Sequence, residues 1–427
     1  MESTAKKLWN RDFSLLVIGQ LISIFGNQVL NFALPLYILE MSGSPALFGT
    51  VLGLSFLPLV ITSPMGGIMA DRLKKQRIMF WLDASITAMI VLYMIMSGLF
   101  AAAIVPIVIV KLLALNAIQG MYMPAVQSSI PFLVPKDKLV QANSATSVVN
   151  TLSNIAAPAA AGFFLGRFGL FPILIICAIC FAITAIMDLM IRIPYKKQQA
   201  AETVAQIVKH DMTQAFRFVK ENPILTNIAI MMFVIAALSI GILMTGVPVF
   251  ITQHLEMSME HMGLGRAISW GGALLGTAIA SFLGERLTIH KVPLFAMLLG
   301  LSMMPIGIVL LLDIHYFAAF IVMIASDFIF TVFVLLYMIA MMTYIQKITP
   351  EELVGKVMSL FSGLPFVAGG LGYLIFGILF EQFYSLSWLI VFVTAFICCI
   401  TVLLFRKHFA GKNINERSAG YKYSGQH

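Results

Sequence analysis

Long apolar runs alternate with short polar segments over almost the whole chain. An apolar run of about 20 residues can cross a bilayer, and inside lipid it must be helical because a helix satisfies its own backbone hydrogen bonds. The runs span residues 13–39, 46–69, 78–99, 103–127, 141–165, 169–192, 223–250, 262–284, 292–312, 316–345, 355–380 and 385–405. This pattern predicts an all-α integral membrane protein with twelve transmembrane helices.

Basic residues mark one side of this predicted bundle. Most of the 27 Lys and Arg residues lie before the first run, after the last run or in every second loop. Short basic loops stay in the cytoplasm, so both termini are predicted to be cytoplasmic, with the protein in a bacterial cytoplasmic membrane. The net charge of +8 is spread over these loops, which favours a lipid bilayer and not nucleic acid as the partner.

The longest polar stretch divides the runs into two sets of six. Asp71-Arg72-Leu73 recurs as Glu285-Arg286-Leu287, and Leu139-Val140 recurs as Leu353-Val354 at the same separation. The repetition predicts two pseudo-symmetric six-helix halves joined by an amphipathic surface helix around 204–219. The predicted parts are a first half (1–193), a cytoplasmic amphipathic linker (194–222), a second half (223–408) and a cytoplasmic tail (409–427).

Composition removes several other classes of protein. Hydrophobic residues make up 60 % of the chain and charged residues 11 %, a balance that no soluble domain has. The four Cys residues fall in apolar runs without the spacing of a metal site, and the seven His residues lie scattered in loops and tails. No phosphate-binding glycine motif is present either, so we expect neither an enzyme nor ATP drive, and no cofactor.

The loop from Gly66 to Arg77 carries a Gly-x-x-x-Asp-Arg spacing within a basic segment. It resembles the motif between helices 2 and 3 of the major facilitator superfamily, the MFS. The resemblance implies a conformational latch on the cytoplasmic side, with Gly67 allowing close helix approach and Asp83 supporting the loop. The residues assigned to this latch are Gly67, Asp71, Arg72, Arg77 and Asp83. An ordinary basic loop that sets topology is the alternative interpretation.

Further segments extend this resemblance over nearly the whole chain. Arg11-Asp12-Phe13, Ala33–Tyr37 and Ser42–Pro45 are similar to the MFS branch that holds macrolide-efflux permeases and the enterobactin exporter. Ala157–Gly162 resembles the helix-5 motif of MFS antiporters, which implies a bend at Pro158 and Gly162. Asn116 and Gln119 match the helix-4 motif Arg-x-x-Gln-Gly, except that Asn116 replaces the arginine linked to proton transfer.

Two charged residues lie inside predicted spans, where ionisable groups are costly and mark functional sites. Lys111 lies in the fourth span and Asp327 in the tenth, which are equivalent spans of the two halves, so the two charges are expected at similar depth. They are predicted to form a charged centre that pairs across the halves and takes part in substrate or proton coupling. A static pair, or a Lys111 side chain that reaches the outer interface, is the alternative. Asp188 and Asp313 lie near span ends and are expected to contact water.

Polar and aromatic residues in the spans supply the remaining candidates. Asn27, Gln28 and Asn31 in the first span either contact substrate or join helices by hydrogen bonds, and Asn154 in the fifth span is expected to join helices. Candidates for lining a cavity are Tyr337, Met341 and Tyr344.

Together these features predict a secondary active transporter that works as a monomer on a small-molecule substrate. The preferred function is proton-coupled export of amphipathic, drug-like or macrolide-like compounds by alternating access. A siderophore or lipid exporter, an importer, and a membrane-embedded sensor or enzyme are the alternatives.

Overall fold

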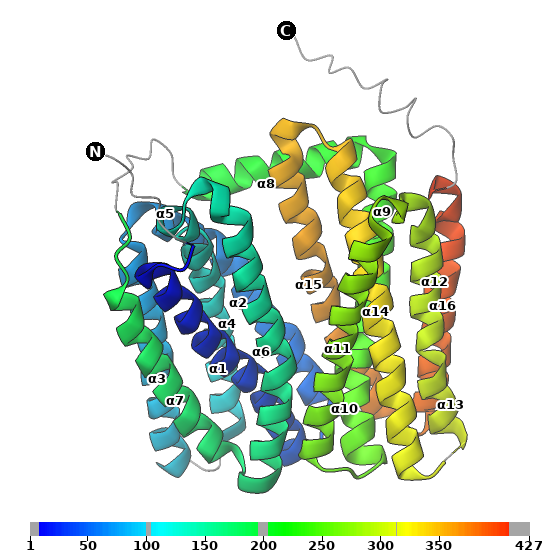
Figure 1. The fold of residues 1–427 in the computed structure, drawn as a ribbon. Helices are drawn as coiled ribbons and strands as arrows, with labels where there is room; N and C mark the ends of the chain where they lie inside the picture. Colours follow the sequence, from blue (N-terminus) through cyan, green and yellow to red (C-terminus); the bar gives the residue numbers. More distant parts are fainter. Residues whose placement is uncertain (1–7, 100–103, 195–203, 313, 410–427) are drawn as a thin grey trace. The chain divides into compact units, whose positions relative to one another are not determined.

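The computed structural model describes residues 8–99, 104–194, 204–312 and 314–409, and these ranges contain helices but no strand. Figure 1 shows the helices in chain order. The α-helices are α1 (Arg11–Ser42), α2 (Pro45–Arg72), α3 (Lys75–Leu99), α4 (Ile104–Gln127), α5 (Ile130–Leu133), α6 (Leu139–Phe168), α7 (Leu170–Met190), α8 (Val204–Glu221), α9 (Pro223–Gly241), α10 (Val247–Val249), α11 (Met259–Leu283), α12 (Val292–Ser302), α13 (Met304–Leu312), α14 (Tyr316–Ile348), α15 (Glu351–Gln382) and α16 (Ser387–Phe409).

Eleven helical segments within the described residues are long and apolar enough to cross a membrane. The predicted span 262–284 is not among them, although it folds as the 25-residue helix α11. Its first turns carry the polar residues Glu260, His261 and Arg266, which lower its mean hydropathy. The all-α membrane fold expected from the sequence is confirmed.

The chain forms two compact units, each described by itself. The first unit comprises Met1–Val208, Leu243–Gly271 and Tyr373–Gln382, and the second comprises the remaining segments. The first unit therefore takes in pieces of α11 and α15 that the sequence places in the second half. We name the end of the first unit where α1 begins the proximal end, and the end where α1 passes into α2 the distal end.

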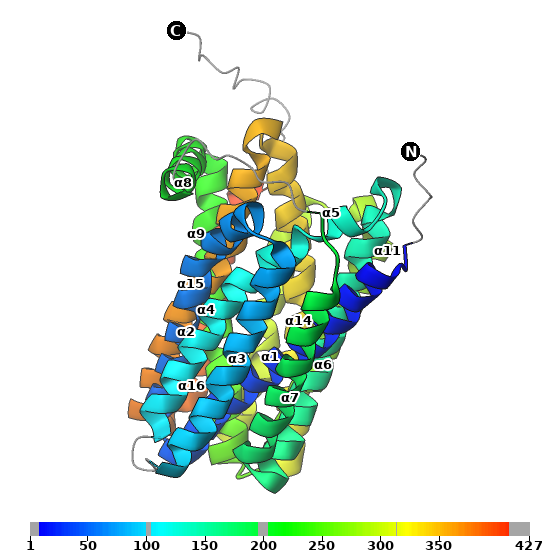
Figure 2. The same cartoon turned by 90° about the vertical axis from the view of Figure 1, so that its left-hand side faces the viewer.

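Helix pairing inside each unit follows a repeated scheme. In the first unit α7 packs against α1 and α3, and α3 packs against α4; α3 and α7 run side by side in both views (Figures 1 and 2). In the second unit α16 packs against α9 and α12, and α12 packs against α14. The third and sixth predicted spans of each half thus pair in the same way, as a duplicated unit requires.

Apolar side chains cover the helix faces as well as the interior. Leu92, Ile186 and Phe396 are all more than half exposed. In water such surfaces would be costly, but hydrocarbon accepts them, so these faces fit contact with lipid.

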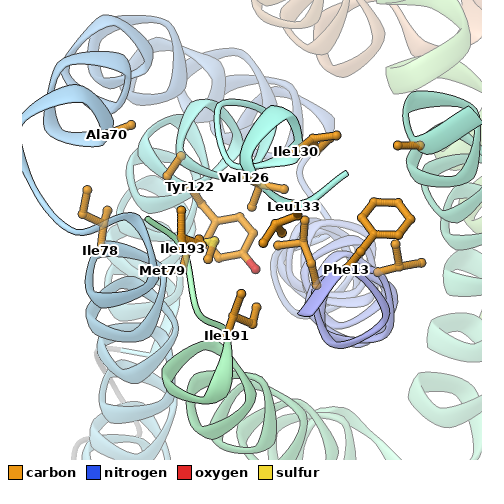
Figure 3. Packing of buried hydrophobic residues seen from close by; sticks show 14 of the residues in the cluster. Phe13, Ala70, Ile78, Met79, Tyr122, Val126, Ile130, Leu133, Ile191 and Ile193 are labelled. Carbon is orange, nitrogen blue, oxygen red and sulfur yellow. The ribbon is translucent and has the colours of Figure 1, made fainter. Parts of the chain in front are cut away.

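A buried apolar cluster closes the proximal end of the first unit. Figure 3 shows Tyr122 of α4 surrounded by Met79, Ile191 and Ile193, with Phe13 and Leu133 nearby. These residues come from α1, α3, α4, α5 and the segment after α7, so the cluster fixes five elements against one another.

The linker forms helix α8, as the amphipathic pattern predicts. Ala215 and Val219 are buried on one face, while Met212 and Phe216 are exposed. Lys356 of α15 holds the helix in the second unit through an ion pair, with its Nζ 2.7 Å from Asp211 Oδ1.

Candidate functional site

The predicted latch loop is a tight turn between α2 and α3. Arg72 and Arg77 are exposed at its two sides, while the side chain of Asp71 lies outside the described residues. Lys75, to which the sequence analysis gave no role in the latch, makes the local contacts: its Nζ donates to the Ala70 carbonyl oxygen at 2.8 Å and lies 5.0 Å from the Phe132 ring centroid. A cation at a helix C-terminus stabilises the free carbonyl groups there, so Lys75 stabilises the end of α2.

Close approach of α2 occurs at Gly66 and not at Gly67. A Cβ atom added to Gly66 would lie 2.5 Å from Met121 Cα of α4, whereas one added to Gly67 would meet nothing within 4 Å. The expectation that Gly67 allows helix approach is therefore wrong. The two glycines are adjacent, and only the way α2 faces α4 decides which one is crowded.

Asp83 lies in the interior of the first unit and not beside the loop. Its Oδ1 accepts a hydrogen bond from Ser23 Oγ of α1 at 3.3 Å, and its Oδ2 accepts one from Thr184 Oγ1 of α7. The carboxyl group is fully buried. Its support of the latch stays a prediction, and its direct contacts join α1, α3 and α7.

Asp188 is also buried, with only 2 % of its surface exposed, so the expectation that it contacts water is wrong. It lies in the last turn of α7, where α1 and α3 both pack against that helix. Asp313 lies outside the described residues.

A chain of amide side chains connects α1 to α4. Asn31 Nδ2 donates to Asn27 Oδ1 at 2.6 Å, and Asn116 Nδ2 donates to Asn31 Oδ1 at 3.1 Å. Gln28 donates to Asn154 of α6. The bond between Asn31 and Asn27 lies within α1, whereas the bonds made by Asn116 and Gln28 join α1 to α4 and to α6. Contact of these amides with substrate stays a prediction. Gln119 lies half-buried on α4.

Lys111 is buried in the interior of the first unit, with 2 % of its surface exposed. Its Nζ lies 4.6 Å from the ring centroid of Tyr93 on α3 and has no hydrogen-bond partner among the described residues. A cation over an aromatic ring is stabilised by the ring quadrupole, which partly offsets the cost of burial. The structure thus shows Lys111 within its own bundle and not at an interface with water.

The remaining candidates lie on α14 in the second unit. Asp327, Tyr337, Met341 and Tyr344 are all buried. The hydroxyl groups of Tyr337 and Tyr344 have no hydrogen-bond partner among the described residues. Asp327 and Lys111 belong to different units, and their pairing stays a prediction.

Two close helix crossings hold the distal end of the first unit together. In the first, Gly162 of α6 meets Gly263 of α11: a Cβ added to Gly162 would lie 2.5 Å from the Met259 carbonyl oxygen and 2.7 Å from Gly263 Cα. In the second, a Cβ added to Gly49 of α2 would lie 2.9 Å from Gly377 Cα of α15. Pro158, buried in α6, contributes its carbonyl to the first crossing, whereas the bend predicted there stays a prediction.

Polar contacts surround these crossings. Arg167 Nε of α6 lies 2.7 Å from Glu260 Oε1 of α11, with 58 % and 32 % of the two side chains exposed. Glu381 at the end of α15 accepts hydrogen bonds from the Ala46 backbone nitrogen, at 2.9 Å, and from the Ser44 hydroxyl group. We call the two crossings and these polar contacts the distal contact. It joins helices from the two halves of the sequence inside one compact unit.

A buried arginine lies next to the distal contact. Arg266 of α11 is 6 % exposed, and its Nη2 donates to the Leu243 carbonyl oxygen at 3.1 Å. Leu243 belongs to a π-helical segment, Ile242–Gly246, between α9 and α10. The sequence analysis gave Arg266 no role, although it lies inside the predicted span 262–284, where an arginine was a usable signal.

Membrane-length helices, buried charges and a duplicated pairing scheme define a polytopic α-helical membrane protein. The chain belongs to the Major Facilitator Superfamily, since the model of that family matches residues 16–372. The protein is therefore a membrane transporter that acts on a small molecule and not an enzyme, as the sequence predicted.

Among curated proteins, the chain is similar to Macrolide efflux protein A of Streptococcus pyogenes, with 23 % identity over 272 residues that cover 63 % of this chain and 67 % of that protein. It is also similar to the uncharacterized MFS-type transporter YkuC of Bacillus subtilis (strain 168), with 22 % identity covering 73 % of this chain and 74 % of that one. These similarities agree with the predicted branch of the superfamily.

Solved structures share the fold at low sequence identity. The nucleoside transporter NupG aligns with a TM-score of 0.71 and 14 % identity, covering 94 % of this chain and 100 % of that one. A bacterial homologue of the iron transporter ferroportin aligns with a TM-score of 0.70 and 14 % identity, covering 94 % and 99 %. At this identity the structures show the fold alone.

Proposed function

We propose that this protein exports amphipathic, drug-like or macrolide-like compounds across a bacterial cytoplasmic membrane, driven by proton antiport. It does so as a monomer, by alternating access between its two halves. The basic loops support a cytoplasmic location for both termini, and in that orientation the distal end faces the outside.

The distal contact is the observation that carries this proposal. Glycine pairs let the helix backbones touch without interlocking side chains, and the polar contacts around them are largely exposed. An exposed ion pair contributes less than about 1 kcal/mol, because water solvates both partners when they separate. A contact of this kind can open and close at low cost, which supports its role as the outer gate of an alternating-access transporter.

Similarity to Macrolide efflux protein A supports both the direction and the cargo. The amide chain of Asn27, Asn31 and Asn116 supplies neutral hydrogen-bonding groups in the first unit. Neutral amides favour an amphipathic compound over a strongly anionic siderophore, which would need several cations.

Coupling is assigned to the buried charges. Lys111 is buried and lacks a hydrogen-bond partner in the described residues, and an ionisable group at such a position inside a membrane span is a candidate for coupling. We retain the hypothesis that Lys111 and Asp327 form a charged centre. Asp327→Asn should abolish proton-driven accumulation, and normal coupling in that variant would refute this assignment.

Everted membrane vesicles that contain the protein test the proposal directly. With an acidic interior, we expect them to accumulate radiolabelled erythromycin and the dye ethidium, and an uncoupler should release both. Vesicles without the protein are the control. A panel with a catecholate siderophore and a fluorescent phospholipid distinguishes the alternative cargoes. The proposal would be overturned if none of these compounds moved in response to the proton gradient.

A further inference from the structure

Two carboxyl groups lie close together inside the first unit, apart from the charged centre discussed above. Asp83 of α3 is held by Ser23 of α1 and Thr184 of α7. Thr184 and Asp188 are four residues apart on α7, so their side chains share one face of the helix. Asp188 therefore lies one turn from the side chain that binds Asp83, and the two carboxyl groups interact electrostatically.

Two buried oxygen atoms at this pair of carboxyl groups lack hydrogen-bond donors among the described residues. Asp188 Oδ2 and Gln20 Oε1 are buried and have no hydrogen-bond partner in the described part of the chain. The antiparallel register of α1 and α7 brings them to one level, since a Cβ added to Gly19 would lie 3.9 Å from Met187 Cε. Buried oxygen acceptors without a donor are costly, and a proton on one carboxyl group would supply the missing donor.

Thr184 allows the pair to exist with or without that proton. Its hydroxyl oxygen is within hydrogen-bond distance of Asp83 Oδ2 and lies 3.0 Å from the Phe181 carbonyl oxygen. A hydroxyl group has one hydrogen, which can point to either acceptor. When it points to Phe181, the Thr184 oxygen can accept a hydrogen bond from a protonated Asp83. Both states therefore need only a hydroxyl rotation.

The neighbours of the pair provide no balancing cation. Helix α4 contributes the buried phenol of Tyr122, whose hydroxyl group points toward Ile191 in Figure 3. Among the described residues of helix α1, Ser23 and Gln20 contribute neutral polar groups. No ion pair joins Asp83 or Asp188 to a Lys or Arg within the described residues. Two ionised carboxylates this close would repel each other strongly, so the pair should retain one proton.

We propose that Asp83 and Asp188 form a proton-binding site that shares one exchangeable proton and takes part in coupling. This inference rests on the proposed function, because it supplies a second proton site for the same transport cycle. The position of Asp188 in the last turn of α7 places the site near the proximal end, beneath the apolar residues Met79, Ile191 and Ile193. Proton exchange is thus expected from that end when this covering loosens.

Transport by the variants Asp83→Asn and Asp188→Asn tests the proposal. Asparagine mimics a permanently protonated carboxyl group, so each variant should keep substrate counterflow but lose proton-driven accumulation by at least about tenfold. The exposed acid variant Asp137→Asn is the matched control and should behave as wild type. Accumulation within about twofold of wild type in both buried variants would overturn the site. Dependence on Na⁺ in place of protons would also overturn it, since the oxygen cluster would then be a cation site.

A direct measurement separates this site from the proposed function. Infrared difference spectra of the purified protein between acidic and alkaline buffer should contain a carboxylic-acid carbonyl band, and Asp188→Asn should reduce it. This variant removes no hydrogen bond from Oδ2, so we expect it to fold. An unchanged band would refute the proton site even if transport is proton-driven. A lost band, with no gradient-driven transport by wild type, would refute the proposed function alone.

Discussion

The distal contact and the buried carboxyl pair use polar groups in opposite ways. Arg167 and Glu260 meet at an exposed surface, where separation returns both charges to water. Asp83 is fully buried among Ser23 and Thr184, and separating those helices would leave a carboxyl group without its donors. Removing such a partner costs about 1–3 kcal/mol per group, more than an exposed ion pair contributes. For the proposed function, this difference favours opening at the distal contact and continued packing around the carboxyl pair.

Reversible cross-linking of the distal contact should have the largest effect. In Arg167→Cys/Glu260→Cys, a short bifunctional thiol reagent should reduce substrate flux to below about a tenth of its starting value, because an outer gate that cannot open traps the cycle. A reductant that cleaves the linker should restore the flux. The two single-cysteine variants, treated in the same way, are the controls. Undiminished flux in the cross-linked protein would show that the distal contact does not gate transport.

Crowding the crossing of α6 and α11 should have the next largest effect. In Gly162→Ala the new Cβ would lie 2.5 Å from the Met259 carbonyl oxygen, a backbone atom that cannot move away alone. We expect the initial transport rate to fall about tenfold, as backbone displacement costs about 1–3 kcal/mol. Gly363→Ala, with nothing within 4 Å of its Cβ, is the control and should transport normally. Equal rates in the two variants would contradict a tight crossing.

The neighbouring glycines of α2 provide a smaller test, on stability. Gly66→Ala places its Cβ 2.5 Å from Met121 Cα and should lower the free energy of unfolding by about 1–3 kcal/mol. Gly67→Ala meets no atom within 4 Å and should leave stability unchanged or slightly raised. Thermal unfolding of the two purified variants measures the difference. A lower melting temperature for Gly67→Ala than for Gly66→Ala would reverse the assignment.

The smallest effect is expected from the exposed ion pair. Arg167→Gln should change the free energy of unfolding by less than about 1 kcal/mol, because more than half of the arginine side chain is exposed. Thr184→Val is the contrasting variant, since it removes a donor from a buried carboxyl group and should destabilise the protein by about 1–3 kcal/mol. Equal destabilisation by the two variants would contradict the expected difference in stability between the exposed distal contact and the buried carboxyl pair.

The features of the fold that depend on hydropathy could be predicted from the sequence. Apolar length and backbone satisfaction in lipid predict membrane helices without reference to tertiary contacts, and the repeated motifs pointed to two similar helix sets. The hydropathy signal is weaker for α11, because Glu260, His261 and Arg266 make this helix less apolar than the other spans. Hydropathy could not predict that parts of α11 and α15 pack with the first half, since that grouping depends on contacts between Gly162 and Gly263 and between Gly49 and Gly377.

Candidate residues were harder to place than helices. Sequence reasoning identified Lys111, Asp83 and the amides of the first span as unusual, because polar groups are rare in lipid. It could not tell which helix each side chain faces. The contact of Lys111 with the Tyr93 ring and the hydrogen bond between Thr184 and Asp83 were therefore not predicted. Asp188 was expected to contact water because of its place near a span end, yet the surrounding helices bury it.

The sequence by itself determined that this protein lies in a lipid bilayer, how long its helices are and to which family of transporters it belongs. These properties depend on composition and on the order of residues along the chain. Only the tertiary structure decided that Gly66 is the crowded glycine, that Lys75 stabilises the end of α2, and that two carboxyl groups share one interior. The physical reason is that the side chains of a helix point in all directions around its axis. Only the packing of the helix against its neighbours decides which side chains face the interior.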